Sequence, residues 1–429
     1  MSRPPELDNL SRSYRPSVNV ARAPEASVPL PFMVAGWGWL LWAIGELLAS
    51  RASLANGVWS APSVIAAVHG VTLGFLTMTM TGFLYQWLPV VFDVPALPRW
   101  FSWSEGGVYL VGLGLFIDGW LAGQMPRVAV GGGLLGVALL AFAIGAMSRV
   151  VRSGRARDTV TAAVFLALLG LTATWVLGFW MAASLAAGRD GAGWLGLHIA
   201  VALVAWMATL VSGVQLKLVP MFAMSRVEGR FTALPAALLW AGLGLDATRF
   251  HETTDAAAML WLAAAIFAAA QVITIRRRGR APEPDTVFTT ILAGWVLWAI
   301  AALLYLVAPP LAVVAGLTGG TVMVLGYQAR LVPFMTALAV ARPLPGPPQK
   351  AFFLARSMNS RLAPRIISLA VPLGALMLVA APVLHQALWV AGGAIVLWVG
   401  WAGSTGSLVA SVLGSMRRRF DTTGGAPGP

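Results

Sequence analysis

The feature that most constrains this chain is a series of apolar stretches, each long enough to cross a lipid bilayer. A helix of about 20 apolar residues spans the hydrocarbon core. We predict twelve spans, at about residues 31–50, 62–90, 104–123, 127–147, 159–186, 193–221, 233–248, 255–275, 287–308, 310–337, 364–384 and 387–414. Of the 429 residues, 58% are hydrophobic and 10% charged, whereas about a quarter of a soluble domain is charged. We therefore expect an all-α polytopic protein in a lipid bilayer.

Basic residues predict the orientation of these spans. With the N-terminus inside, only Arg51, Arg127, Arg189 and Arg249, of 29 lysines and arginines, fall on the outer side. Cytoplasmic loops carry such an excess of Lys and Arg, which predicts a bacterial cytoplasmic (inner) membrane with both termini cytoplasmic. The net charge of +13 then reflects topology, and we expect no nucleic-acid partner.

The two ends of the chain are expected to lie outside the membrane domain. Residues 1–30 are polar, basic and proline-rich, and they lack the apolar core of a signal peptide. This composition predicts a disordered basic cytoplasmic tail. Residues 416–429 are predicted to form a second cytoplasmic tail, which leaves 31–415 as the membrane domain.

One helix ending occurs three times, as "GFLYQWLPVVF", "GVQLKLVPMF" and "GYQARLVPFM". The glycines are Gly82, Gly213 and Gly326, and a proline follows each by seven residues. Glycine permits close helix approach and proline ends a helix, which accounts for any one ending. Three of them, spaced by four spans, predict three four-helix repeats, at about 31–150, 158–276 and 286–415. Helices 2, 6 and 10 are then equivalent. "WLLWAIGELL" from Trp39 also matches "WVLWAIAALL" from Trp295.

Polar side chains within the spans are candidates for a functional pocket. They are the carboxylates Glu46, Asp118 and Asp246, and the helix-end groups Gln86, Gln215, Lys217, Gln328 and Arg330. A charge at the centre of a membrane costs about 2.5–3.5 kcal/mol, so such groups usually face the protein interior. The carboxylates fall in the outer halves of their spans, which predicts a polar site opening outward. The alternative is that Glu46 and Asp118 are structural groups near the interface.

Ligands for a metal or a haem are few in this chain. It has no cysteine and four histidines, which excludes disulfides, thiolate metal sites and covalent c-type haem. His69 and His198 fall near the outer ends of helices 2 and 6. They are the candidate ligands, although a single histidine in a span also serves as a hydrogen-bonded structural residue.

The segments "HGVTLGFLTMTMTGFLYQWLP" from His69 and "HIAVALVAWMATLVSGVQLKLVPMF" from His198 carry a family resemblance. Together with the twelve spans, they resemble subunit I of the haem–copper oxidases, and more closely its non-oxidase NnrS-type relatives, over residues 31–415. The resemblance implies a haem- or metal-binding protein in redox or nitric oxide handling. It also implies a b-type haem bound by His69 and a metal ligand in His198.

The ligand set departs from that of an oxidase. Thirteen residues before the three glycines stand His69, Ala200 and Val313, and fifteen before them stand Ala67, His198 and Leu311. An oxidase supplies two haem ligands from helix 10 and further copper ligands from helix 7, and neither helix has a histidine at these positions here. The departure argues against a three-histidine copper site and against a terminal oxidase.

Two other functions fit the same sequence. A small-solute transporter or channel also has internal repeats and buried charges. A cofactor-free membrane assembly factor would need no ligands at all. For the haem or metal-binding protein, we expect a redox partner or other membrane subunits.

Overall fold

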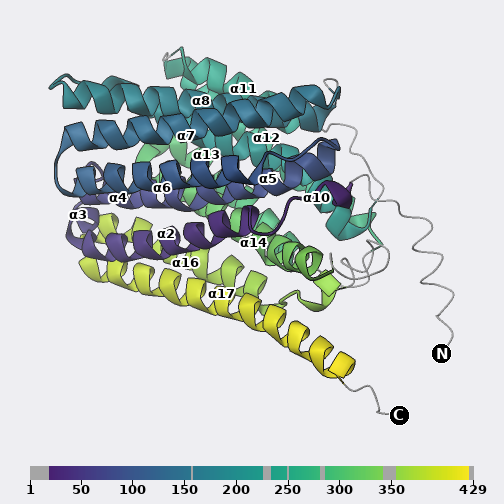
Figure 1. Cartoon of the computed structure of the whole chain (residues 1–429). Helices are drawn as coiled ribbons and strands as arrows, with labels where there is room; N and C mark the ends of the chain where they lie inside the picture. Colours follow the sequence, from purple (N-terminus) through teal and green to yellow (C-terminus); the bar gives the residue numbers. More distant parts are fainter. Residues whose placement is uncertain are drawn as a thin grey trace, which may run out of the picture.

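The computed structural model describes residues 19–155, 158–225, 233–248, 251–280, 286–341 and 354–424. All regular elements in these ranges are helical, and the long helices lie side by side in one bundle (Figure 1). The end at which α2 begins and α17 ends is called the terminal end here. The other end, where helices 2 and 6 begin, is called the histidine end.

Three helical rods form the centre, and they keep the names helix 2, helix 6 and helix 10. Helices 2 and 6 each consist of several consecutive elements, whereas helix 10 is a single element. Helix 2 comprises α4 (Pro62–His69), η2 (Gly70–Thr77) and α5 (Met78–Phe92); helix 6 comprises η3 (Ala192–Trp194), α9 (Leu195–Ala200), η4 (Val201–Ala208) and α10 (Thr209–Ala223); helix 10 is α14 (Pro309–Ala341).

The remaining helices surround this centre. They are η1 (Val20–Arg22), α2 (Pro29–Ala49), α3 (Arg51–Ala55), α6 (Arg99–Leu121), α7 (Met125–Arg152), α8 (Thr159–Ala186), α11 (Leu234–Asp246), α12 (His251–Arg277), α13 (Val287–Val307), α16 (Leu362–Leu384) and α17 (Ala387–Gly424).

Of the twelve predicted spans, ten are confirmed as helices long and apolar enough to cross a membrane. The other two are helical but fall outside that set. With 23 residues, α6 has the length but not the apolar composition, and α11 has 13 residues. At 1.5 Å per residue α11 is about 20 Å long, shorter than the roughly 30 Å of a bilayer core.

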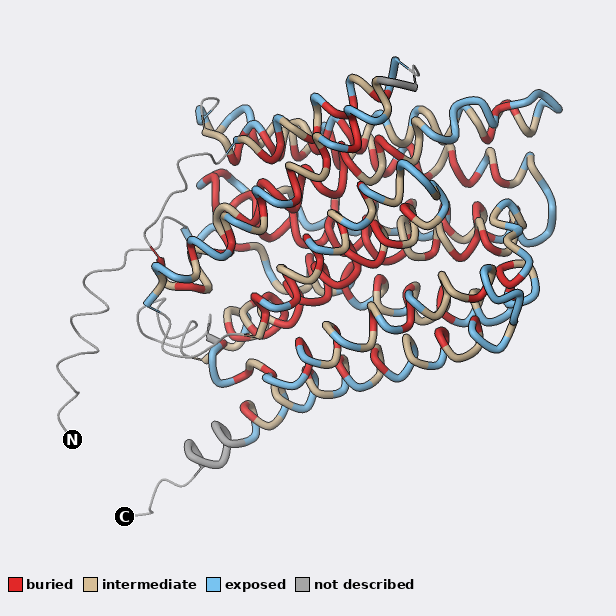
Figure 2. Tube along the Cα trace, turned by 180° about the vertical axis from the view of Figure 1, so that it is seen from behind, coloured by how far each residue is buried: buried red, intermediate tan, exposed pale blue. Residues whose placement is uncertain are grey.

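The central position predicted for helices 2, 6 and 10 is confirmed by their burial. Within their most apolar stretches, 67%, 72% and 72% of the residues are buried, against 28% to 50% in the other seven spans. Figure 2 shows the buried positions gathered in the middle of the bundle. Helices apolar all round occupy a core, whereas the outer helices keep one face for lipid.

The glycine of each repeated ending lies where two helices meet. A Cβ added to Gly82 would lie 2.6 Å from Phe32 Cβ, and one added to Gly213 would lie 2.7 Å from Ala163 Cβ. At Gly326 it would overlap Thr290. In each case the partner helix precedes the central helix directly in the chain, which confirms close approach as the role of these glycines.

The prolines of the endings do not stop their helices at once. Helices 2 and 6 continue for three residues past Pro89 and Pro220 before ending at Asp93 and Met224, whose φ angles are +55° and +51°. Helix 10 continues past Pro333 to Ala341. Proline removes one hydrogen bond to the preceding turn, and here the following turn stays helical.

Helices 2 and 6 share a second local feature. Each contains an eight-residue π-helical segment, Gly70–Thr77 and Val201–Ala208, which begins twelve residues before Gly82 and Gly213 respectively. Such wide turns are rare and often occur at functional sites. Helix 10 remains α-helical at the same positions, 314–321, and it is also the helix without the histidine.

The chain before α2 differs from the predicted tail. Residues 1–18 lie outside the described part, but Asn19 donates its backbone N–H to Val90 at 2.8 Å. Ion pairs join Arg22 to Asp93 at 3.0 Å and Arg99 to Glu25 at 3.3 Å. Residues 19–28 therefore lie against the terminal end of helix 2 and α6. At the other end of the chain, α17 continues through the predicted 416–429 tail as far as Gly424.

Candidate functional site

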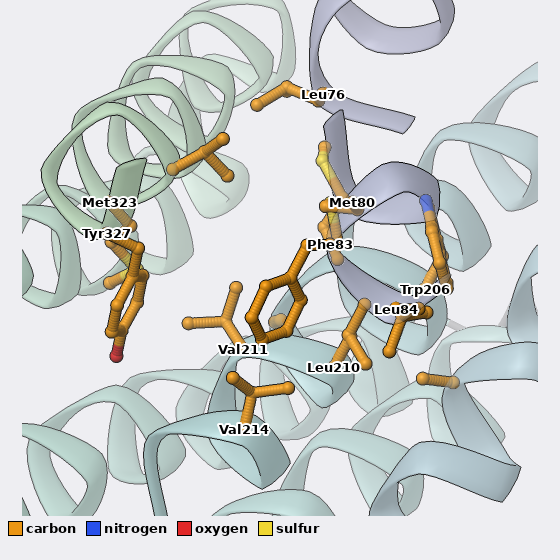
Figure 3. Close-up of a cluster of buried hydrophobic side chains, with 14 of the residues drawn as sticks. Leu76, Met80, Phe83, Leu84, Trp206, Leu210, Val211, Val214, Met323 and Tyr327 are labelled. Carbon is orange, nitrogen blue, oxygen red and sulfur yellow. The ribbon is translucent and has the colours of Figure 1, made fainter. Parts of the chain in front are cut away.

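The packed centre of the bundle leaves one small apolar pocket between helices 2, 6 and 10, with room for about one water molecule. Leu76, Met207 and Gly320, each six residues before the repeat glycine, line it together with Met80, Val211 and Val324, each two residues before. Trp295 and Trp298 of α13 also line it. In Figure 3 Met80, Val211 and Met323 come from the three central helices. The described side chains that line this pocket turn only apolar atoms toward it, so water has no hydrogen-bond partner there.

Two buried glutamines connect the central helices to their neighbours. Trp295 of α13 donates its indole N–H to Gln215 Oε1 at 2.9 Å, and Gln215 donates to Gln271 at 3.3 Å. Trp37 of α2 donates to Gln328 Oε1 at 2.8 Å, and Gln328 donates to Thr79 at 3.3 Å. Both predicted polar residues are therefore satisfied by other side chains and hold the bundle together.

His69 ends α4 near the histidine end. Its Nδ1 lies 2.8 Å from the carbonyl oxygen of Ile65, one turn back, and its ring packs edge-on against Phe116 of α6 at 5.0 Å. A carbonyl oxygen only accepts hydrogen bonds, so Nδ1 carries the proton. In a neutral imidazole Nε2 then keeps its lone pair. The acceptor for this N–H is thus a backbone carbonyl of the same helix.

His198 has the same arrangement in helix 6. Its Nδ1 lies 3.1 Å from the carbonyl oxygen of Thr174 in α8. Its ring rests on Gly178, where a Cβ would lie 2.9 Å from the imidazole Cε1. The glycine thus makes room for the imidazole.

These two imidazoles fit the donor chemistry of a haem or a metal. Histidine ligands commonly donate one ring N–H to a backbone carbonyl and bind through the other nitrogen. In the described residues no group of three or more His, Cys, Asp or Glu side chains gathers as a metal site would require. Each imidazole therefore offers one ring nitrogen with a free lone pair to a ligand group.

The three predicted carboxylates have different surroundings. Asp118 forms an ion pair with Arg127 and its side chain is 58% exposed, so the expected inward position is wrong. Asp246 is buried and accepts a hydrogen bond from Tyr305 of α13 at 2.7 Å. Glu46 is partly buried, and within the described residues its carboxylate has no hydrogen bond or ion pair with either histidine.

The equivalent helix-end groups lie toward the terminal end. Gln86 is buried, whereas Lys217 and Arg330 are partly buried in helices 6 and 10. Long basic side chains at such positions extend to the membrane surface while their stems stay in the apolar part. They lie at the other end of the central helices from His69 and His198, so the predicted residues do not form one pocket.

The sequence analysis missed a buried carboxyl group, Glu105 of α6. Tyr85 of α5 donates its hydroxyl to Glu105 Oε2 at 3.1 Å, and Glu105 is 5% exposed. The predicted span began at 104, which placed this residue at the membrane surface, but α6 begins at Arg99. A signal was present: Tyr109 follows Glu105 by four residues on one helix face, in a chain with five tyrosines.

No protein-family model matches this chain, and no curated protein does.

Proposed function

We propose that this chain is a twelve-helix membrane protein of three four-helix repeats that binds a haem, or a metal ion, through a single histidine. Both termini are placed in the cytoplasm, and the membrane is a bacterial cytoplasmic membrane. The haem is b-type and bound by His69; His198 is the second candidate ligand. The role is in redox chemistry or nitric oxide handling, with a redox partner or membrane subunits, and without dioxygen reduction.

The repeat is supported by equivalent positions in the central helices. The three glycines all meet the preceding helix. The central pocket is lined by residues six and two positions before each glycine. Helices 2 and 6 also share the π-helical segment and the left-handed residue eleven positions after the glycine. In this proposal α6 and α11 complete the twelve helices, with α11 supported laterally by α12 and helix 6.

The observation that carries the proposed binding role is the orientation of His69. Its Nδ1–H is held by the Ile65 carbonyl, which fixes the ring and leaves Nε2 as the ligating nitrogen. The edge of Phe116 restrains the ring from the side. A bound haem would supply a redox-active iron that takes small ligands, while the chain holds the proximal nitrogen in place.

The test is the absorption spectrum of protein purified after expression with ample haem. We expect a Soret band in the wild type, its loss in His69→Ala, and its retention in His198→Ala. His385→Asn is the matched control, because His385 is exposed at the end of α16 with a φ of +51° that asparagine tolerates. A band unchanged in His69→Ala rejects His69 as the ligand. No band in the wild type favours a transporter or a cofactor-free assembly factor.

A further inference from the structure

The geometry of Glu105 is that of a buried acid without a cation. One carboxylate oxygen, Oε2, accepts the hydrogen bond from Tyr85. The other, Oε1, is buried and has no hydrogen-bond partner in the described part of the chain. A carboxylate with an unsatisfied buried oxygen is costly, because the charged oxygen has lost its hydrogen bonds to water without gaining one in the protein.

Aromatic side chains enclose this pair. The ring of Phe32 from α2 lies 5.4 Å from the ring of Tyr85 and touches the backbone of α6 at Gly106. Phe142 from α7 packs edge-on against Tyr85 at 5.2 Å. Tyr109, one turn along α6, donates its own hydroxyl to the carbonyl oxygen of Leu73 at 2.9 Å, so it does not compete for Glu105.

Among the residues that the structure describes, no positive charge balances Glu105. The ion pairs between described residues join Arg22 to Asp93, Arg99 to Glu25 and Arg127 to Asp118. The cation on its own helix, Arg99, is thus committed to Glu25. Tyr85 from α5 donates to Glu105, and the rings packed on Tyr85, Phe32 from α2 and Phe142 from α7, are apolar. A charged carboxylate would be uncompensated there, whereas a carboxylic acid carries no net charge.

We propose that Glu105 is a reversible proton-binding site. It holds a proton as a carboxylic acid, Tyr85 fixes its orientation, and the proton exchanges with water at the terminal end of the bundle. Glu105 stands six residues after the start of α6, which places it about 9 Å from that end at 1.5 Å per residue. Residues 19–28 lie beside this end of α6 through the Glu25–Arg99 pair.

A carbodiimide provides the first test, because it adds to the protonated carboxyl group and not to a carboxylate. The membrane-embedded wild type is treated with dicyclohexylcarbodiimide and the modified peptides are identified by mass spectrometry. We expect modification of Glu105, lost in Glu105→Gln, retained in Glu46→Gln, and decreasing as the pH is raised. Absence of modification at Glu105 across the pH range, with reaction at Glu46, overturns the proposal.

Infrared spectroscopy provides a second test that does not depend on reagent access. The difference spectrum between the wild type and Glu105→Gln should contain the C=O band of a carboxylic acid. The band should shift in D₂O, which reports exchange, and shift in Tyr85→Phe, which removes the hydrogen bond. Glutamine has nearly the same shape and can accept from Tyr85. No band, or a band that never shifts in D₂O, contradicts reversible proton binding. Neither test requires haem, so the result is independent of the proposed function.

Discussion

Trp37 donates its indole N–H to Gln328 across 2.8 Å, although 291 residues separate the two along the chain. The bond joins α2, the first long helix, to helix 10. Trp295 makes the corresponding bond to Gln215 in helix 6. Gln215 and Gln328 both stand two residues after the repeat glycine. Each thus ties a central helix to one of the surrounding helices through a buried hydrogen bond.

We expect Trp37 and Gln328 to be energetically coupled. Trp37→Phe removes the donor of this hydrogen bond, and Gln328→Leu removes its acceptor. Each substitution leaves the remaining group buried without its hydrogen-bond partner. Each single variant should lose about 1 kcal/mol of unfolding free energy, with a coupling of about 0.6 kcal/mol, the average for side-chain hydrogen bonds within membranes. A double-mutant cycle of denaturant unfolding in detergent measures it. Trp401→Phe is the control, because the Trp401 indole nitrogen has no partner among the described residues; strict additivity would contradict the coupling.

Two glycines of helix 10 should respond oppositely to alanine. At Gly326 a Cβ collides with Thr290, so Gly326→Ala should lower the unfolding free energy by about 1–3 kcal/mol. At Gly320 the nearest atoms to a new Cβ, Leu76 Cδ1 and Met207 Sδ, lie 3.8 Å away. Gly320→Ala should therefore be neutral or stabilise by up to about 1 kcal/mol, through helix propensity. Thermal unfolding of the purified variants decides this. An equal loss in both would show that the helices do not pack as described.

Attachment of residues 19–28 should depend on pH through Asp93. Hydrogen bonds from Arg22 and Asn19 lower the pKa of this carboxyl group below its usual range. Because the pKa of Asp93 is lower in the folded state than in the unfolded state, its ionised carboxylate stabilises the attachment fully at pH values above the unfolded-state pKa. This stabilisation is lost as the pH falls through the folded-state value. A cysteine introduced at Ala23, which is buried in the attached segment, should thus react with a thiol reagent slowly at neutral pH.

The same cysteine should react faster under strongly acidic conditions, after correction for the pH dependence of the reagent itself. Asp93→Asn should react fast at neutral pH and change little on acidification, because asparagine tolerates the left-handed backbone of this position. Asp118→Asn is the control, since its ion pair lies at the histidine end. A pH profile that is identical in wild type and Asp93→Asn would contradict the assignment.

Cysteine labelling should also establish the topology, because the native chain has no cysteine. Asn56→Cys, in the loop after α3, should react with a membrane-impermeant maleimide added to intact cells. Arg278→Cys, just after α12, should react only once the membrane is opened. Both positions lie in described loops at opposite ends of the bundle. Labelling at position 278 in intact cells would invert or disprove the predicted orientation.

The sequence was informative wherever one physical requirement acts on a long stretch. Crossing a bilayer demands many consecutive apolar residues, so ten spans and the all-helical class were predictable. The repeated glycines marked sites of close helix approach before any contact was known. The central place of helices 2, 6 and 10 followed from the same pattern. These properties belong to segments, and the sequence of a segment determines them.

Which polar groups face one another was decided by tertiary structure alone. Asp118 and Glu105 are both carboxylates of α6, yet one pairs with Arg127 at the surface and the other is buried against Tyr85. Helical periodicity gives the angle between them but not which face meets α5 and α7. The orientation of His69 likewise depends on a backbone carbonyl one turn away. Such relations depend on distances across the bundle, which exist only after the helices have packed.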